Sequence, residues 1–243
     1  MRIIKLNAID STNTFMKELG TVETLKDYTV VTAKYQTQGR GQMGTVWQSF
    51  EGKNLMFSVF KNVSFLHPEH TFFISIVASL SVLKTLKGFN MPRLKIKWPN
   101  DILSENKKIC GILIENVMSN NQLKGTIIGI GLNVNQTEFN NLPQASSLLL
   151  ISGRVFNLEE LMENIVINMR HYFSFLKNGK RELLLSKYEN NLFRKNKPST
   201  FKDEKGELFT GFIQGISESG CLKIILEDNV TKEYELKQVS LLY

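Results

Sequence analysis

A chain of 243 residues with 42% hydrophobic and 22% charged residues is long enough for one large domain, or for one core domain with a small appendage. Its formal net charge of +7 invites an anionic partner, although a solvated, lysine-rich surface is a simpler account of charge alone. The first ten residues do not form a signal peptide pattern, no apolar run is free of charge over a membrane-spanning length, and the two distant cysteines argue against a disulfide framework or a zinc site; the expected location is therefore cytoplasmic.

In chain order, the first half predicts both helices and strands. Capping residues and Gly20 predict a short helix over 10–20, and a proline start with helical apolar spacing predicts a long, buried helix over 68–89. β-branched and aromatic residues predict strands over 28–37 and 54–62. An antiparallel series follows, with strands predicted over 93–103, 109–117 and 126–135 and turns between them.

The second half changes character near residue 195. Amphipathic patterns predict helices over 158–176 and 179–193. After "RKNKPS", five short strand candidates separated by turn residues predict a small, barrel-like β module. We therefore expect two domains, residues 1–195 and residues 196–243.

The stretch "YQTQGRGQMGTVWQ", residues 35–48, contains the glycine pattern of a nucleotide-binding loop. No helix follows it, which excludes the dinucleotide-binding fold, and the chain lacks the H-R-D and D-F-G motifs of a kinase. Closely spaced glycines still allow a backbone to approach an anion, with Arg40 as a mobile cation. A flexible surface loop explains the glycines alone equally well.

A second group of polar residues lies in "KWPNDILSENKK". Lys97, Asn100 and Asp101 stand where a strand enters a turn, and Lys108 opens the returning strand. Each residue alone is ordinary turn chemistry, but together they place two cations, an amide and a carboxylate at one end of a sheet. Such a set is suited to a nucleoside triphosphate and its magnesium ion.

The motifs "DSTN", "YQTQGRGQMGTVW", "KWPND", "KKICGILIE" and "GIGLNVN" occur in the order found in biotin protein ligases. The chain resembles the short form of that family, which begins directly at the catalytic domain and leaves no room for an N-terminal DNA-binding domain. The resemblance implies an α/β (α+β) catalytic domain with a mixed, mostly antiparallel sheet, followed by a C-terminal SH3-like β-barrel. It also implies an ATP-dependent ligase that forms biotinyl-5′-AMP and transfers biotin to a lysine of a biotin carboxyl carrier domain, such as that of acetyl-CoA carboxylase.

The resemblance also assigns residues. The biotin-binding set would comprise Ser11, Thr12, Asn13, Gln36, Gly39, Gly41, Gln42, Trp47 and Gly111. The nucleotide-binding set would comprise Arg40, Lys97, Asn100, Lys108, Gly131 and Asn133. Arg40 and Lys108 would stabilise the carboxylate and the α-phosphate, while Asp101 would hold Mg²⁺ or orient the incoming lysine amine.

Three details of this assignment leave alternatives open. Ser11 and Thr12 are equally typical of helix capping, and Trp47 is equally typical of core packing. Many family members carry a basic residue at the position of Gln42, where it helps to retain the adenylate. With Gln42 in its place, we expect faster release of the intermediate.

Other functions are weighed against the ligase. A lipoate ligase or octanoyl transferase shares the fold, but "KWPND" and the glycine loop favour biotin, and no "GGG" run is present. A DNA-binding repressor would need an unrecognised surface, so we expect no DNA partner and no membrane contact. A catalytically dead biotin-binding module is disfavoured by Arg40, Asp101 and Lys108. A monomer or weak homodimer is compatible with the sequence.

Overall fold

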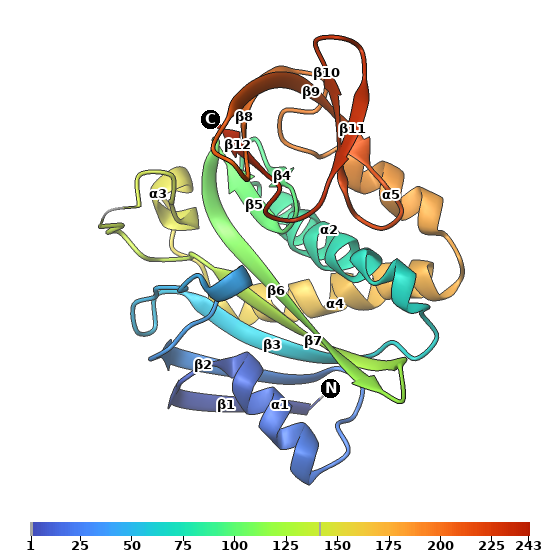
Figure 1. The fold of residues 1–243 in the computed structure, drawn as a ribbon. Coiled ribbons are helices and arrows are strands. Elements are labelled where there is room, and N and C mark those ends of the chain that lie inside the picture. The colour runs from blue at the N-terminus through green and yellow to red at the C-terminus, as the bar shows by residue number, and fades with distance from the viewer. Residues whose placement is uncertain (1, 141) are drawn as a thin grey trace.

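The computed structural model describes residues 2–140 and 142–243, and its main feature is a seven-stranded sheet (Figure 1). The strand order is β1-β2-β3-β7-β6-β5-β4, with β1 and β2 parallel and the other neighbours antiparallel. A mixed, mostly antiparallel sheet is thus confirmed. The strands are β1 (Arg2–Ile9), β2 (Thr29–Gln36), β3 (Leu55–Asn62), β4 (Lys95–Lys97), β5 (Asp101–Ser104), β6 (Lys107–Ser119) and β7 (Gln122–Leu132).

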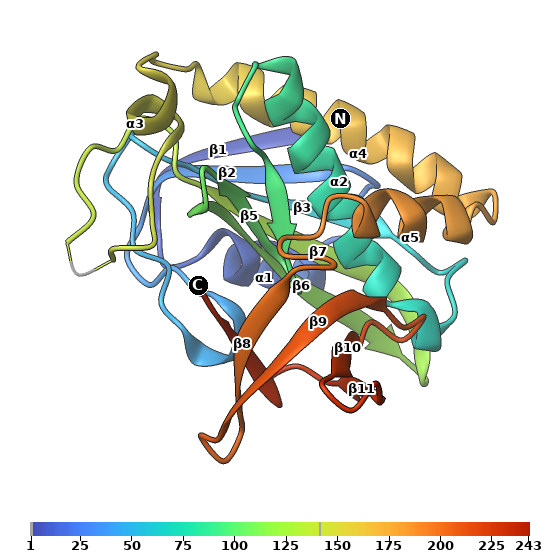
Figure 2. The same ribbon diagram turned by 90° about the horizontal axis from the view of Figure 1, so that it is seen from above.

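Helices cover both faces of this sheet. The long helices α2 (Phe72–Gly88) and α4 (Leu158–Lys177) pack on one face, with α5 (Arg181–Glu189) beside them, and α1 (Thr12–Val22) lies on the other face (Figures 1 and 2). The short helix α3 (Leu148–Ser152) follows the loop after β7, and 3₁₀ turns occupy Gln42–Gly44 and Pro68–His70. The main hydrophobic core therefore fills the space between the sheet and the two long helices.

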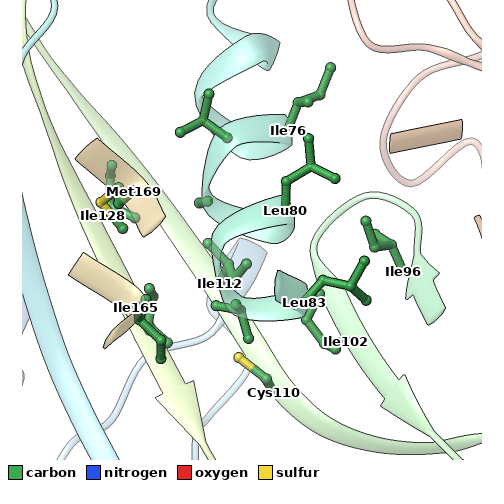
Figure 3. Close-up of a cluster of buried hydrophobic side chains, with 14 of the residues drawn as sticks. Ile76, Leu80, Leu83, Ile96, Ile102, Cys110, Ile112, Ile128, Ile165 and Met169 are labelled. Carbon is green, nitrogen blue, oxygen red and sulfur yellow. The ribbon is translucent and has the colours of Figure 1, made fainter. Parts of the chain in front are cut away.

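The alternation of side chains along the central strands divides the core from the functional face. Cys110 and Ile112 of β6 and Ile128 of β7 pack against α2 and α4, where Figure 3 shows them beside Leu80 and Ile165. The intervening positions point to the α1 face, and several of them are glycines. The apolar side chains of these strands are thus buried against α2 and α4, and the glycines leave space above the sheet on the α1 face.

The segment Pro68–Gly88 has the length and apolar composition of a membrane-spanning helix, but 67% of its most apolar window is buried inside the protein. Its apolar residues contact the sheet and α4 rather than lipid, as the cluster around Ile76, Leu80 and Leu83 illustrates (Figure 3). The predicted buried helix is therefore confirmed, and its apolar character is explained by the core.

A second sheet follows the helices. It has five antiparallel strands in the order β11-β10-β9-β8-β12. They are β8 (Pro198–Asp203), β9 (Leu208–Ile216), β10 (Leu222–Leu226), β11 (Thr231–Tyr234) and β12 (Val239–Leu242). The five predicted strands are confirmed, but β11 and β12 are opposite edges of an open sheet, so the closed SH3-like barrel is not confirmed.

Two predictions about the first sheet need correction. The single strand expected over 93–103 is two short antiparallel strands, β4 and β5, because the chain reverses at Trp98-Pro99-Asn100. The first strand β1 was not predicted, because "RIIKLNAI" alternates only weakly and its burial depends on pairing with β2. The turn at residues 98–100 is the more important correction, since it carries Asn100 and joins the strand ends that carry Lys97 and Asp101.

Candidate active site

A cavity of about 560 Å³ opens on the α1 face of the large sheet. Its walls come from the start of α1, the glycine loop, the turn between β4 and β5, and the small sheet, chiefly β12 and the connection before it. Predicted residues that line it are Ser11, Thr12, Asn13, Gln36, Arg40, Gly41, Gln42, Trp47, Lys97, Asn100, Asp101, Lys108, Gly111 and Gly131. The fold therefore gathers predicted site residues from Ser11 to Gly131, 120 positions apart, into one cavity.

Glycines on β6 and β7 form the floor of the cavity. Gly111 and Gly131 are directly paired across the two strands, and a Cβ on either would lie 3.0 Å or 2.5 Å from the Trp47 ring. A Cβ on Gly129 would lie 2.4 Å from Oδ1 of Asn13. These glycines are thus required so that Trp47 and Asn13 can approach the sheet closely.

One end of the cavity is polar and hydrogen-bonded. Oε1 of Gln36 accepts hydrogen bonds from the backbone N of Thr12 at 2.8 Å and from its Oγ1 at 3.0 Å. This fixes the orientation of the Gln36 amide, so that its Nε2 group remains as a donor for a ligand. Ser11 is the N-cap residue of α1, yet its side chain makes no capping hydrogen bond, so capping does not account for its hydroxyl.

Behind this end lies a buried network that the sequence did not reveal. Ser58 on β3 is fully buried, and its Oγ lies 2.7 Å from Oγ1 of Thr12 and 2.5 Å from Oδ1 of Asn13. Nδ2 of Asn13 in turn donates to Oε2 of Glu115 at 2.7 Å. The side chains of Thr12 and Asn13, at the start of α1, are therefore held in defined rotamers before any ligand is present.

The glycine loop is closed on itself rather than extended. The backbone N of Trp47 donates to Gly39 O at 2.8 Å, and that of Gly41 donates to Thr45 O at 2.7 Å. A Cβ on Gly39 would lie 2.3 Å from Trp47 O, and one on Gly41 would lie 2.3 Å from the Thr45 hydroxyl, whereas Gly44 adopts a φ of +84°. The glycines thus allow close approach within the loop, and the Gly41 amide is engaged there instead of pointing to an anion as expected.

Arg40 reaches from this loop to the sheet. Its Nη2 lies 2.9 Å from Oε2 of Glu115, and the two side chains are 44% and 28% exposed. A guanidinium carries five donors, so this contact leaves others for a ligand. Arg40 is therefore a cation at the cavity wall whose position is already set by a carboxylate.

The other end of the cavity carries two lysines and one carboxylate. Nζ of Lys108 lies 2.7 Å from Oδ1 of Asp101 and 5.9 Å from the centre of the Trp47 ring. Burial lowers the pKa of Lys97; Asp101 opposes this effect and the charge of Lys108 adds to it. Two cations confined near each other, with one carboxylate between them, form a suitable environment for a polyanion.

The turn that carries these groups is fixed by three contacts. Nε1 of Trp98 donates to Gly220 O at 2.9 Å, and the hydroxyl of the buried Tyr188 donates to Pro99 O at 3.0 Å. Nδ2 of Asn100 donates to Ile112 O, so the side chain of Asn100 supports the turn as well as lining the cavity. The turn is thus attached to a helix, to β6 and to the small sheet.

Two predicted site residues lie outside the lining. Gly39 contributes to the closure of the loop, and Asn133 is buried with its Nδ2 donating to Ser146 O at 3.0 Å. Sequence reasoning in turn missed Ser58, the role of Glu115, and the wall formed by the small sheet and the segment before it. That wall consists of Phe193, Ile213, Leu222, Leu236, Lys237, Val239, Ser240 and Leu241. The hydrophobic pattern of a strand does not indicate that the ends of the strand will face a cavity formed by residues distant in the sequence.

Comparisons with known proteins agree with this geometry. The sequence model of the Biotin/lipoate A/B protein ligase family matches residues 6–133. The bifunctional ligase/repressor BirA of Escherichia coli is 26% identical over 97% of this chain and 73% of its own length, and that of Bacillus subtilis is 29% identical over 85% of this chain and 64% of its own length. The biotin protein ligase of Aquifex aeolicus, solved in complex with biotin and ATP, is 29% identical with a TM-score of 0.83 over 99% of this chain and 98% of that one.

Proposed function

Because this chain belongs to the biotin/lipoate A/B protein ligase family, we propose that it is an ATP-dependent biotin–protein ligase, of the biotin–[acetyl-CoA-carboxylase] ligase type. The observation that carries the proposal is the cavity itself, which joins a neutral hydrogen-bonding end to a cationic end. Biotin has the same division, since its ring system is a neutral urea and its chain ends in a carboxylate.

The neutral end fits a urea better than a dithiolane ring. Gln36 presents an amide N–H, and Ser11 and Thr12, of which Thr12 is hydrogen-bonded to Gln36, present hydroxyl groups beside it. A urea carbonyl and its two N–H groups would pair with such side chains, whereas a lipoyl ring would leave them unpaired. Sites with polar groups reject ligands that cannot pair with them by large factors.

The cationic end suits the first half-reaction. A carboxylate oxygen of biotin attacks the α-phosphorus of ATP, and pyrophosphate leaves. Arg40 and Lys108 would bring the two anions together and neutralise the charge that develops on the phosphate, and Lys97 and Asn100 would bind the nucleotide. Trp47, held on Gly111 and Gly131, would exclude water from the acyl-adenylate.

The second half-reaction transfers the biotinyl group to protein. The amine of a lysine on a biotin carrier domain attacks the acyl carbon of the adenylate, and AMP leaves. Asp101 would orient this amine, because it is the acidic side chain among the described lining residues. We place the reaction in the cytoplasm, in line with the sequence-based expectation.

Mg²⁺ is proposed as the metal that accompanies ATP. No group of three or more metal-binding side chains occurs within residues 2–140 and 142–243. Asp101 pairs with Lys108 through Oδ1, which leaves Oδ2 for a cation. Such a donor set fits an ion held chiefly by phosphate oxygens and water, with Asp101 as a single protein ligand; the ion would neutralise the triphosphate.

Biotin-dependent pyrophosphate–ATP exchange tests the proposal. In the presence of Mg²⁺ and biotin, the purified protein is expected to exchange labelled pyrophosphate into ATP. No exchange is expected when biotin is replaced by lipoate or omitted. Lys108→Ala should reduce the exchange by about 100-fold or more, because it removes a cation that faces the developing charge. Lys5→Ala, which removes an exposed cation paired with Glu159, is the matched control and should leave the exchange unchanged.

Each result has a separate meaning. Exchange that depends on lipoate would retain the family and overturn the substrate. Measurable biotin binding without any exchange would indicate a binding module and would overturn the proposal that the protein is an enzyme. Full exchange by Lys108→Ala would overturn the role of that lysine alone.

A further inference from the structure

Glu115 lies on β6 at the edge of the cavity, two positions beyond the lining residue Leu113 and on the same face of the strand. Its side chain is 28% exposed, and it does not itself line the cavity. A partly buried carboxylate at this place requires a physical reason, because removing it from water costs free energy unless its charge is paired.

Two cavity residues share one oxygen of this carboxylate. Oε2 of Glu115 accepts from Nη2 of Arg40 at 2.9 Å and from Nδ2 of Asn13 at 2.7 Å. Arg40 belongs to the glycine loop and Asn13 to the start of α1, so Glu115 connects two walls of the cavity through the sheet. A charge-assisted contact of this kind restricts the guanidinium more strongly than a neutral one would.

The connection continues to the polar end of the cavity. Oγ of Ser58 lies within hydrogen-bonding distance of both Oδ1 of Asn13 and Oγ1 of Thr12, and the backbone N of Thr12 donates to Oε1 of Gln36. A continuous chain of hydrogen bonds therefore runs from the residues placed around the biotin ring to the arginine placed at the biotin carboxylate. Members of such a chain polarise and orient one another.

We propose that Glu115 is a positioning residue that holds Arg40 over the reacting carboxylate and α-phosphate; this inference rests on the proposed function. It acts through Arg40 and does not touch substrate. With Nη2 committed to Glu115, Nη1 and Nε of Arg40 remain to bind oxygen atoms of the ligand. The ion pair restrains the guanidinium at the cavity wall, although its side chain is 44% exposed.

Glu115→Gln is the direct test. The glutamine keeps the size of the side chain and an oxygen acceptor for Asn13, and it removes the charge that restrains Arg40. We expect kcat/KM for biotin in pyrophosphate–ATP exchange to fall about tenfold, the loss that corresponds to one charge-assisted hydrogen bond. Glu159→Gln, which breaks the exposed pair with Lys5, is the matched control and should change neither exchange nor thermal midpoint.

Testing Glu115→Gln in an Arg40→Gln protein distinguishes a positioning role of Glu115 from a purely structural one. If Glu115 acts through Arg40, the loss caused by Glu115→Gln disappears in an Arg40→Gln protein, where there is no guanidinium to restrain. Direct biotin binding is measured in parallel on all four proteins, so that the comparison survives where exchange becomes slow. A purely structural role would instead produce the same fold loss in both backgrounds.

The outcomes are distinct. Loss in the wild-type background alone supports the proposal. Equal losses in both backgrounds, or no loss in either, overturn it while the ligase function stands. Absence of biotin-dependent exchange in the unmodified protein overturns the proposed function itself, before Glu115 is considered.

Discussion

At the scale of single residues, the cavity concentrates positive charge where water is partly excluded. Lys97 and Lys108 both line it, with Asp101 between them. Burial lowers the pKa of Lys97, because the charged ammonium loses hydration, and this effect exceeds the attraction of Asp101. A bound triphosphate would reverse the balance by favouring the charged form. The protonation of Lys97 and the binding of ATP should therefore be coupled.

This coupling predicts a pH dependence of KM for ATP. Below the lowered pKa of Lys97 the side chain is charged and KM is constant; as pH rises through that pKa, which lies below the ordinary value of about 10.4, the charge is lost and KM rises. The full rise in KM is expected to be about tenfold, which corresponds to the loss of one charge-assisted contact with the triphosphate.

Lys97→Arg provides the matched comparison, since a guanidinium stays charged throughout this range. The variant should show a flat KM for ATP over the alkaline interval in which the wild-type value rises, whatever its absolute affinity. Parallel pH profiles of the two proteins would contradict the assignment of Lys97 to the nucleotide.

At the scale of elements, the glycine loop has a defined shape. Backbone hydrogen bonds join Gly39 to Trp47 and Gly41 to Thr45, so the loop is a closed unit beside the cavity rather than a flexible connection. Within it, Gln42 lines the cavity without supplying charge. A neutral amide forms weaker hydrogen bonds to phosphate than a guanidinium does, which bears on how long an adenylate stays bound.

Gln42→Arg is therefore expected to slow release of the adenylate about five- to tenfold, by replacing a neutral contact with a charge-assisted one. Release is measured by following labelled biotinyl-5′-AMP from preformed complexes. Gln48→Arg adds the same charge to an exposed position outside the lining and serves as the control. Equal release rates for wild type and Gln42→Arg would remove the explanation based on charge.

Sequence reasoning succeeded for elements whose signal is local. The apolar periodicity of α2 and α4 and the turn residues of the small sheet specify those elements directly. It failed for β1, which depends on a partner strand, and it did not divide β4 from β5, although Pro99 and Asn100 were read as turn residues. In the site, motif residues were found because they recur in a known order. Glu115 ends the motif "KKICGILIE", but the motif alone assigned it no role, because that role arises from contacts with Asn13 and Arg40.

At the scale of the whole molecule, the small sheet completes the cavity. Residues 236–241 supply one wall, and Trp98 donates to Gly220, so the turn carrying Asn100 and Asp101 is attached to this sheet. The contact between the small sheet and the helical part of the protein is reinforced by Glu189 at the end of α5. Its carboxylate accepts from Nζ of Lys195 at 2.9 Å and from the backbone N of Ile216 at 3.0 Å. Stability and the shape of the nucleotide end should therefore depend on the same contacts.

Glu189→Ala is expected to lower the free energy of unfolding by about 1–3 kcal/mol, because the backbone N of Ile216 and the ammonium of Lys195 both lose a partly buried partner. It should also raise KM for ATP more than KM for biotin, since the small sheet contacts the lysine end of the cavity: the centre of the Tyr243 ring lies 5.0 Å from Nζ of Lys97, and Gly220 O accepts from Trp98. Chemical denaturation and exchange kinetics measure the two effects.

Glu189→Gln separates the two contacts of that carboxylate. The amide oxygen can still accept from Ile216 while the ion pair with Lys195 is lost, so an intermediate loss of stability is expected with a KM for ATP close to wild type. Glu159→Ala removes an exposed pair and should change stability by no more than about 0.5 kcal/mol. Destabilisation by Glu189→Ala with both KM values unchanged would mean that the wall keeps its place without this contact, and that the small sheet is held over the cavity by the attachment at Trp98 instead.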